Sequence, residues 1–262
     1  MGFLQGKRIL ITGALTSNSI AYGIAQACAR EGAELAFTYQ DDRIAPRIRK
    51  LAAQFGTNLC FRCDVADDRQ IEHLFIDLGE HWPQLDGLVH SIGYAPPASL
   101  EGDFLESLSR EAFRTAHDIS SYSFAALAKA AKPLMDGCKG ALLTLSYIGA
   151  SRCAPTYNVM GLAKASLEAS VLYLAHSLGK QGIRANAISA CPLRTVAATG
   201  VEAFEQMLAH QEQTAPLSKE ITVQDVGNVA AFLLSDLAGG ITGQVVFVDG
   251  GFSSVSGLVI PT

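Results

Sequence analysis

A tyrosine and a lysine stand seven residues apart in the stretch from Tyr157 to Lys164. An α-helix has 3.6 residues per turn, so positions i and i+7 share one face, two turns apart. An ammonium group placed this way can favour the ionised phenol, or hold a polar ligand beside it. Tyrosine and lysine on one helix face are usually only neighbours. The pair therefore predicts chemistry only together with other features of the chain.

The elements that must position this pair alternate along the chain. Runs rich in Val, Ile and Leu, typical of strands covered on both faces, alternate with stretches of helical period. We expect strands at 7–12, 34–39, 58–63, 87–92, 141–146, 184–189 and 245–248. We expect helices at 19–31, 42–54, 67–81, 109–135, 157–179, 201–213 and 223–235. This alternation predicts an α/β fold: a single Rossmann-type domain, residues 1–262, with a doubly wound parallel sheet of about seven strands.

Two of the expected helices carry signals at their ends. Gly32 follows the first helix at the position where a left-handed residue commonly closes a helix. Thr222 stands three residues before Asp225, which resembles the capping box that begins many helices.

The bulk composition excludes several classes of protein. The chain has 262 residues, 49 % hydrophobic and 17 % charged, and a formal net charge of −5. A negative chain is a poor non-specific binder of nucleic acid or of a membrane surface. No apolar run reaches the ~20 residues of a membrane span, and the N-terminus lacks the basic-then-apolar layout of a signal peptide. We therefore expect a cytoplasmic enzyme with no nucleic-acid or membrane partner.

Cys60 and Cys63 form a Cys-x-x-Cys pair that invites a metal or redox interpretation. They fall in an expected strand, where positions i and i+3 point to opposite faces. No second pair of Cys or His residues stands nearby in the sequence, as a zinc site would require. We interpret the thiols as small buried hydrophobes in a reducing compartment and expect no metal.

The first strand runs into a turn that could receive a dinucleotide. Gly13 follows the strand, and Ser17, Asn18 and Ser19 precede the helix. A pyrophosphate needs backbone N–H groups at a helix N-terminus, which glycine lets it approach closely. The usual G-x-G-x-x-G spacing is absent, because only Gly13 and Gly23 are present and they stand ten residues apart. The position of the turn, rather than its motif, indicates a dinucleotide site.

The end of the second strand bears on the coenzyme. Gln40 offers no positive charge to a 2′-phosphate, and Asp41 and Asp42 would repel one. We expect a preference for NADH over NADPH, although Arg43 offers a cation close by.

Other polar residues follow the later strands. Asp64 follows the third, and Ser146 with Tyr147 ends the fifth. His90 ends the fourth strand and is interpreted as a core histidine whose ring is hydrogen-bonded. Ligands of open α/β sheets bind outside the carboxyl ends of the strands, so these residues predict one binding edge.

Three motifs together resemble the divergent short-chain dehydrogenase/reductases. They are Gly13-x5-Ser19-x-Ala21-x-Gly23, Tyr157-x6-Lys164 and Val248-Asp249-Gly250-Gly251. Within that group the chain resembles the bacterial NADH-dependent enoyl-(acyl-carrier-protein) reductases of fatty-acid synthesis, from Met1 to about Phe252. The stretches 90–93 and 116–123 share in this resemblance.

The resemblance implies roles for the matching residues. The positions that would hold NADH are Gly13, Ser19, Ile20, Gln40, Asp64, Val65, Ile92, Lys164, Leu193, Arg194, Thr195, Val196 and Ala197. Ala95, Tyr147 and Tyr157 would contact the substrate. Tyr147, Tyr157 and Lys164 would be the catalytic residues, with Tyr157 at the thioester carbonyl. Cys191 is a departure, because relatives usually carry glycine there.

The activity implied is reduction of the 2,3 double bond of a carrier-linked trans-2-enoyl thioester by NADH, the last step of fatty-acid elongation, in a homotetramer. One alternative is a short-chain carbonyl reductase. Those enzymes carry a tyrosine four residues before the lysine, where this chain has Met160, which cannot donate a proton. Another alternative is an NAD-binding regulator without turnover, against which Tyr147, Tyr157 and Lys164 speak.

The charge of the helix expected at 201–213 bears on the carrier protein, because in this family that helix borders the acyl entrance and carrier proteins are acidic. No Lys or Arg occurs from residue 196 to 218, while Glu202, Glu205 and Glu212 are acidic. We expect the carrier not to dock electrostatically on this helix. Basic residues elsewhere are the alternative: Arg152, Arg194 or Lys219.

Overall fold

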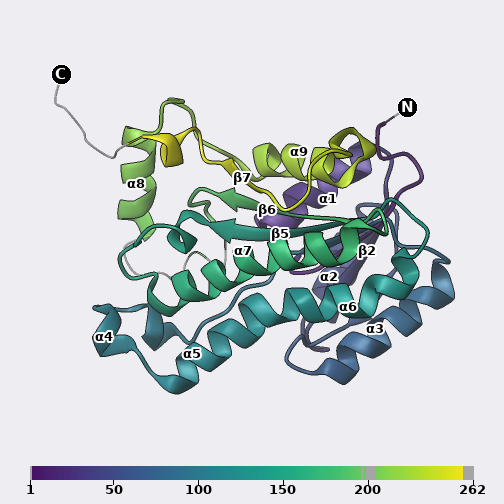
Figure 1. Ribbon diagram of the computed structural model, residues 1–262, viewed down its shortest axis with the longest axis horizontal. Helices are drawn as coiled ribbons and strands as arrows, with labels where there is room; N and C mark the ends of the chain where they lie inside the picture. The colour runs from purple at the N-terminus through teal and green to yellow at the C-terminus, as the bar shows by residue number, and fades with distance from the viewer. Residues whose placement is uncertain (1, 196–197, 199–203, 256–262) are drawn as a thin grey trace.

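The computed structural model describes residues 2–195, 198 and 204–255 (Figure 1). Its centre is a sheet of seven parallel strands in the order β3-β2-β1-β4-β5-β6-β7. The strands are β1 (Arg8–Ile11), β2 (Glu34–Tyr39), β3 (Cys60–Arg62), β4 (Gly87–His90), β5 (Ala141–Tyr147), β6 (Arg184–Ala190) and β7 (Val245–Val248). The predicted strand count and parallel architecture are confirmed.

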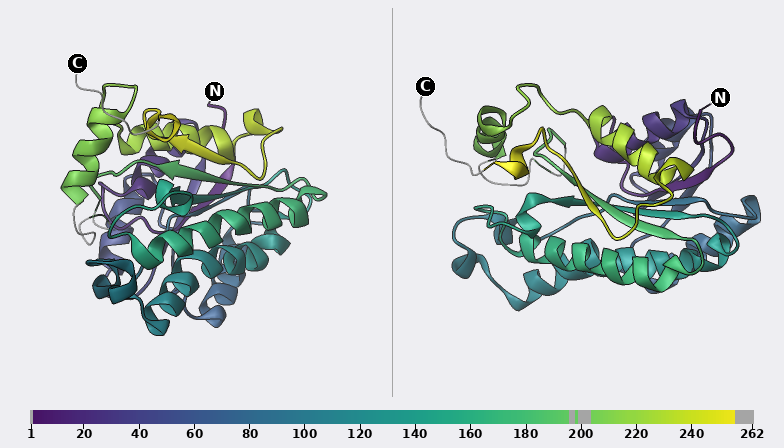
Figure 2. Two further views of the ribbon diagram at one scale, coloured as in Figure 1. Left: turned by 60° about the vertical axis from the view of Figure 1, so that its left-hand side comes forward. Right: turned by 45° about the horizontal axis from the view of Figure 1, so that its top comes forward.

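Helices cover both faces of the sheet, as a parallel sheet requires (Figure 2). One apolar core joins the sheet to α1 (Ile20–Arg30), α2 (Ala45–Ala53) and α9 (Val223–Leu234). A second core joins the other face to α3 (Asp68–His81), α6 (Ser123–Met135) and α7 (Asn158–Gly179). Further helices include the 3₁₀ helix η1 (Pro97–Leu100), α4 (Phe104–Ser107), α5 (Arg110–His117) and α8 (Phe204–Thr214).

The single helix predicted at 109–135 is wrong in its middle. α5 and α6 are separated there by a π-helical turn, Asp118–Tyr122. Ser120 in this turn donates its hydroxyl to the carbonyl oxygen of Tyr94 at 3.0 Å and accepts from the Tyr94 N–H at 2.9 Å. The wide turn thus fixes the loop that follows β4. Such turns are common near functional sites, but hydrophobic periodicity does not reveal them.

The helix-end signals are confirmed. Gly32 has φ +90° immediately after the last residue of α1's cap. Thr222 and Asp225 form the reciprocal capping box of α9. Gly23, by contrast, belongs to helix packing, because a Cβ there would overlap the carbonyl oxygen of Val223 on α9.

Cys60 and Cys63 face opposite sides of the sheet, as predicted. Cys60 packs against the core on the α1 side, whereas Cys63 lies in the core on the α3 side. Among the described residues, none of the helices is long and apolar enough to cross a membrane.

Candidate active site

Two adjoining cavities, of about 450 and 490 Å³, lie where the parallel strands end. They are joined by wall residues that both share: Ile20, Ser91, Ile92, Gly93, Tyr94 and Thr195. We call the cavity beside β2 and β3 the adenosine cavity, and the one beside β5 and α7 the catalytic cavity. Together they form a trough long enough to take an elongated ligand across the carboxyl edge of the sheet.

The adenosine cavity brings together the residues predicted for one end of NADH: Gly13, Ser19, Ile20, Gln40, Asp64, Val65 and Ile92. Gly13 has φ +78°, and a Cβ there would overlap the carbonyl oxygen of Ser91. Ser19 caps α1 and accepts from the Tyr22 N–H. The N-terminus of α1 lies beside Gly13, which has no side chain to block the approach of a pyrophosphate, so the site fits this group although the G-x-G-x-x-G spacing is absent.

The polar ends of β2 and β3 are tied to each other. Gln40 donates its amide to a carboxylate oxygen of Asp64 at 3.3 Å. Arg43 donates to Asp41 at 2.8 Å, and this hydrogen bond lowers the pKa of the Asp41 carboxyl. The guanidinium of Arg43 is therefore already engaged by a carboxylate.

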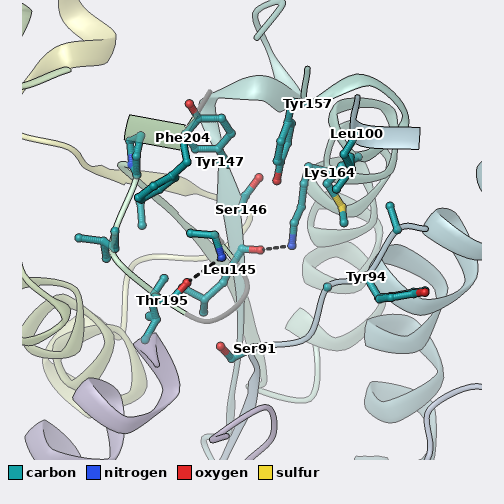
Figure 3. A pocket seen from close by; sticks show the side chains of 18 of the residues that line it. Ser91, Tyr94, Leu100, Leu145, Ser146, Tyr147, Tyr157, Lys164, Thr195 and Phe204 are labelled. Atoms are coloured by element: carbon teal, nitrogen blue, oxygen red, sulfur yellow. Dashed lines mark hydrogen bonds between the residues drawn. The ribbon is translucent and has the colours of Figure 1, made fainter. Parts of the chain in front are cut away.

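The catalytic cavity contains the three predicted catalytic residues (Figure 3). Tyr147 ends β5, Tyr157 immediately precedes α7, and Lys164 lies on α7. The two phenol rings meet edge to face, with centroids 4.9 Å apart. The Lys164 ammonium donates to the carbonyl oxygen of Leu145 at 2.7 Å. Tyr157 and Lys164 line the same cavity, but α7 begins at Asn158 rather than at the predicted residue 157, and Asn158 has φ +40°, so a regular helical i, i+7 spacing does not account for the placement of Tyr157.

Burial sets the protonation of all three groups. It raises the pKa of Tyr147 to about 12 and that of Tyr157 further, so both phenols keep their protons at neutral pH. It lowers the pKa of Lys164 to about 8, against which Glu168 acts by attraction. Glu168 accepts a 2.5 Å hydrogen bond from Ser146, and burial raises the pKa of its carboxyl. The cavity therefore holds two phenol donors near a cation.

The residues of the loop after β6 do not all line the cavity, which the sequence did not indicate. Leu193 and Thr195 line the catalytic cavity. Arg194 lines neither cavity, and its exposed side chain pairs with Glu205 on α8. Val196 and Ala197, also predicted to hold NADH, lie outside the described residues.

The remaining wall of the catalytic cavity is apolar, and sequence reasoning missed most of it. Ala95 was predicted, and it lines the cavity. The residues missed are Pro97, Leu100, Phe204 and Met207, together with the aromatic Tyr94. Phe204 and Met207 stand three apart on α8, which is the one periodic signal that points to them. Such a wall suits a hydrocarbon chain.

Two further residues bear on the interpretation of the cavity. Cys191 lines it, and burial raises the pKa of its thiol to about 12, so the sulfur stays protonated. His90 is fully buried, with its ring nitrogens 2.8 Å from the hydroxyls of Thr144 and Ser123. Burial lowers the pKa of His90 to about 3. The interpretation of His90 as a neutral core residue is confirmed.

Comparisons with known proteins agree with this geometry. A family model described as "Enoyl-(Acyl carrier protein) reductase" matches residues 13–253. NADH-dependent enoyl-(acyl-carrier-protein) reductases of Neisseria meningitidis and Escherichia coli are 59 % and 58 % identical over 253 residues, which is 97 % of this chain and 97 % and 96 % of theirs.

Solved structures give the same result. The crystal structure of the Aquifex aeolicus enoyl-(acyl-carrier-protein) reductase (NADH) has a TM-score of 0.94 and 49 % identity, covering 97 % of this chain and all of that one. The Anaplasma phagocytophilum enoyl-(acyl-carrier-protein) reductase, solved in complex with NAD, has a TM-score of 0.92 and 42 % identity, covering 97 % of this chain and 95 % of that one.

Proposed function

Because the chain belongs to the NADH-dependent enoyl-(acyl-carrier-protein) reductases, we propose that Tyr157, Tyr147 and Lys164 perform its chemistry. The reaction is the reduction of the 2,3 double bond of trans-2-enoyl thioesters, the last step of fatty-acid elongation. NADH, when bound, supplies the hydride that the β-carbon receives.

The roles of the three residues follow from their protonation states: two neutral phenols and one ammonium. As the β-carbon gains the hydride, negative charge develops on the thioester oxygen, and a proton added to the α-carbon then completes the reduction. The Tyr157 hydroxyl, protonated at neutral pH, donates a hydrogen bond to that oxygen, with Tyr147 in edge contact beside it. Lys164, fixed by Leu145, stabilises the charge at longer range and holds the nicotinamide ribose. A wall that is mostly apolar strengthens both effects.

The observation that carries this assignment is Met160. It lies four residues before Lys164 and lines the same cavity, where a carbonyl reductase would need its proton donor. A thioether has no proton to give. Tyr157, further back along the chain, is the phenol that enters the cavity from this segment, and its reach suits an oxygen two carbons from the hydride acceptor.

The remaining NADH positions are part of the same proposal. Gly13, Ser19, Ile20, Gln40, Asp64, Val65 and Ile92 hold the pyrophosphate and adenosine, supported by their shared cavity. Leu193 and Thr195, which line the catalytic cavity, lie beside the nicotinamide in this proposal, and Arg194, Val196 and Ala197 are included from the resemblance alone. Ala95 contacts the substrate.

Replacing Tyr157 by Phe tests the assignment. The loss of one donor to developing charge is worth roughly 2–4 kcal/mol where water cannot substitute, so kcat for enoyl thioesters falls roughly 30- to 1000-fold. NADH oxidation with crotonyl-coenzyme A measures this, and NADH binding should be unchanged. Tyr173→Phe is the matched control, since Tyr173 is 78 % exposed on α7. An unchanged kcat in Tyr157→Phe would transfer the role to Tyr147 or to a water.

We also propose that the physiological substrate is carried by acyl carrier protein and that the enzyme is a cytoplasmic homotetramer. Exposed apolar side chains support the assembly: Leu162 and Leu172 on α7, and Phe247 on the edge strand β7. Light scattering of the purified protein measures the assembly directly. A monomer at micromolar concentration would contradict it.

A further inference from the structure

The backbone is unusual on both sides of Tyr157. Thr156 has φ +61° and Asn158 has φ +40°. Among the described residues, these two alone combine a side chain with a positive φ. Such conformations are unfavourable for any residue with a Cβ, although asparagine tolerates them best. They persist where surrounding contacts impose them, so the contacts of Asn158 bear on the placement of Tyr157.

The Asn158 side chain makes those contacts with a distant segment. Its amide nitrogen donates to the hydroxyl of Ser107 at 3.0 Å. It also lies 3.4 Å from the carbonyl oxygens of Glu101 and Gly102. All three partners act as acceptors, so the interaction depends on an N–H donor on residue 158.

The segment that Asn158 contacts, residues 97–107, forms part of the apolar wall of the catalytic cavity, which we call the acyl-chain wall. Pro97 and Leu100, just before Glu101, line the catalytic cavity. Leu100 and Phe104 also pack with Val159 and Tyr157 in a small apolar cluster of their own. The Asn158 side chain therefore connects the segment that carries Pro97 and Leu100 to the start of α7, directly after Tyr157.

We infer that Asn158 is a positioning residue, whose amide fixes the segment 97–107 against the start of α7. The Tyr157 hydroxyl and the acyl-chain wall then keep one relative placement. This inference rests on the proposed role of Tyr157. It gives residue 158 a function separate from NADH binding, because Asn158 lines neither cavity.

The variant Asn158→Gly separates the effect of the side-chain amide from the effect of the positive φ at residue 158. Glycine adopts φ +40° without strain, so this variant loses the hydrogen bonds alone. We expect kcat to fall about 10-fold and KM for a dodecenoyl thioester to rise about 5-fold. The KM for NADH should not change. The KM for crotonyl thioester should rise less, since a four-carbon chain makes little contact with the wall.

Three other variants complete the series. Asn158→Asp should also be impaired, since a carboxylate cannot donate to the carbonyl oxygens of Glu101 and Gly102, whereas the Ser107 hydroxyl can turn and donate to it. Ser107→Ala removes one acceptor and should raise the dodecenoyl KM about 3-fold in a fully folded protein. Asn228→Ala is the matched control, because this exposed asparagine on α9 accepts from Arg30 at 3.0 Å, remote from both cavities.

A double-mutant cycle identifies the coupling. Ser107→Ala combined with Asn158→Gly should be no worse than Asn158→Gly alone, because the two residues share one interaction. Adding Asn158→Gly to Tyr157→Phe should lower kcat no further while still raising the dodecenoyl KM. Normal kcat and KM in Asn158→Gly, or additive effects of the Ser107 and Asn158 changes, would overturn the inference.

The remaining outcomes separate this inference from the proposed function. An impaired Asn158→Ala beside a normal Asn158→Gly would mean that residue 158 matters only through its backbone, which also overturns it. If Tyr157→Phe keeps its kcat, the proposed function fails first. If Tyr157→Phe is slow and Asn158→Gly is normal, only the positioning role fails.

Discussion

Lys164 is a cation placed where burial disfavours charge. The lysine is 7 % exposed, and burial lowers its pKa from 10.5 to about 8. Below pH 8 it is charged in both the folded and the unfolded chain, so the full cost of burying the ammonium is present. Between pH 8 and 10.5 the folded chain loses the proton while the unfolded chain keeps it, so this cost disappears. Lys164 therefore destabilises the free enzyme at neutral pH, a cost consistent with the role at the cofactor proposed for it.

The variant Lys164→Met tests whether the buried ammonium lowers the stability of the free enzyme. At pH 7 the variant should unfold with a free energy higher by up to about 3 kcal/mol, less the lost hydrogen bond to Leu145. The difference should shrink as the pH approaches 10.5, because the lysine is then neutral when folded. Urea unfolding at pH 7 and pH 10, without NADH, measures both values, and NADH affinity should fall sharply in the variant. A variant less stable than the parent at pH 7 would show that Leu145 and Glu168 outweigh burial.

At the residue scale the sequence indicated the side chains that the structure brings into one cavity, but not the contacts that support them. Tyr157 and Lys164 could be predicted from their residue types and their place in the chain, although Tyr157 lies just outside α7 and the helical spacing assumed for the pair does not hold. Asn158 stands in the same stretch, yet neither its positive φ nor its bond to Ser107 is encoded locally. Both depend on a segment fifty residues away. The pairing of Arg194 with Glu205 could not be predicted for the same reason, since it depends on where α8 lies.

At the element scale, the loop after β2 decides how a coenzyme phosphate would be received. Arg43 is the cation in that loop, and Asp41 holds it at 2.8 Å. A 2′-phosphate would have to compete with this carboxylate. The predicted preference for NADH thus rests on an ion pair as well as on the absence of charge at Gln40.

Asp41→Ala should release Arg43 and admit NADPH. We expect kcat/KM for NADPH to rise several-fold through KM, with kcat/KM for NADH nearly unchanged. Steady-state rates with both coenzymes at fixed enoyl thioester measure this. Asp41→Ala combined with Arg43→Ala is the control and should lose the gain. If the single variant gains nothing, Arg43 does not reach the ribose.

Elements were predicted best where one periodicity runs without interruption. The seven strands follow from apolar runs that any parallel sheet must bury. The π-helical turn at 118–122 was missed because its cause is tertiary: the hydroxyl of Ser120 bonds the backbone of Tyr94. The short helices η1 and α4 were missed because a four-residue helix carries too little periodic signal.

On the scale of the whole molecule, the charge distribution governs the approach of the carrier protein. The chain has a net charge of −5. α8 flanks the catalytic cavity through Phe204 and Met207, and its first turn carries Glu205. Glu205 pairs with Arg194, so a basic residue near the mouth is already neutralised. An acidic partner therefore finds little attraction on this side, and complementary charge mainly speeds encounter.

Reversing the acidic charges near α8 should help the carrier. Glu202→Lys with Glu205→Lys adds two cations and releases Arg194, although Glu202 itself lies outside the described residues. We expect a lower KM for the carrier-linked substrate at low salt and almost no change for the coenzyme A substrate. The gain should fade toward ~0.5 M salt, where the Debye length falls to a few Å.

A matched control separates local from overall charge. Glu72→Lys with Asp77→Lys changes the net charge equally, but on α3, which lies at the opposite end of the molecule from α8 (Figure 1). If only the α8 pair lowers the carrier KM, the carrier passes close to α8 and is repelled there in the parent enzyme. Equal gains from both pairs would mean that long-range repulsion by the whole chain limits encounter. A higher carrier KM in the α8 pair would show that these glutamates, or the Arg194 pair, are themselves contacts, and the electrostatic argument would fail.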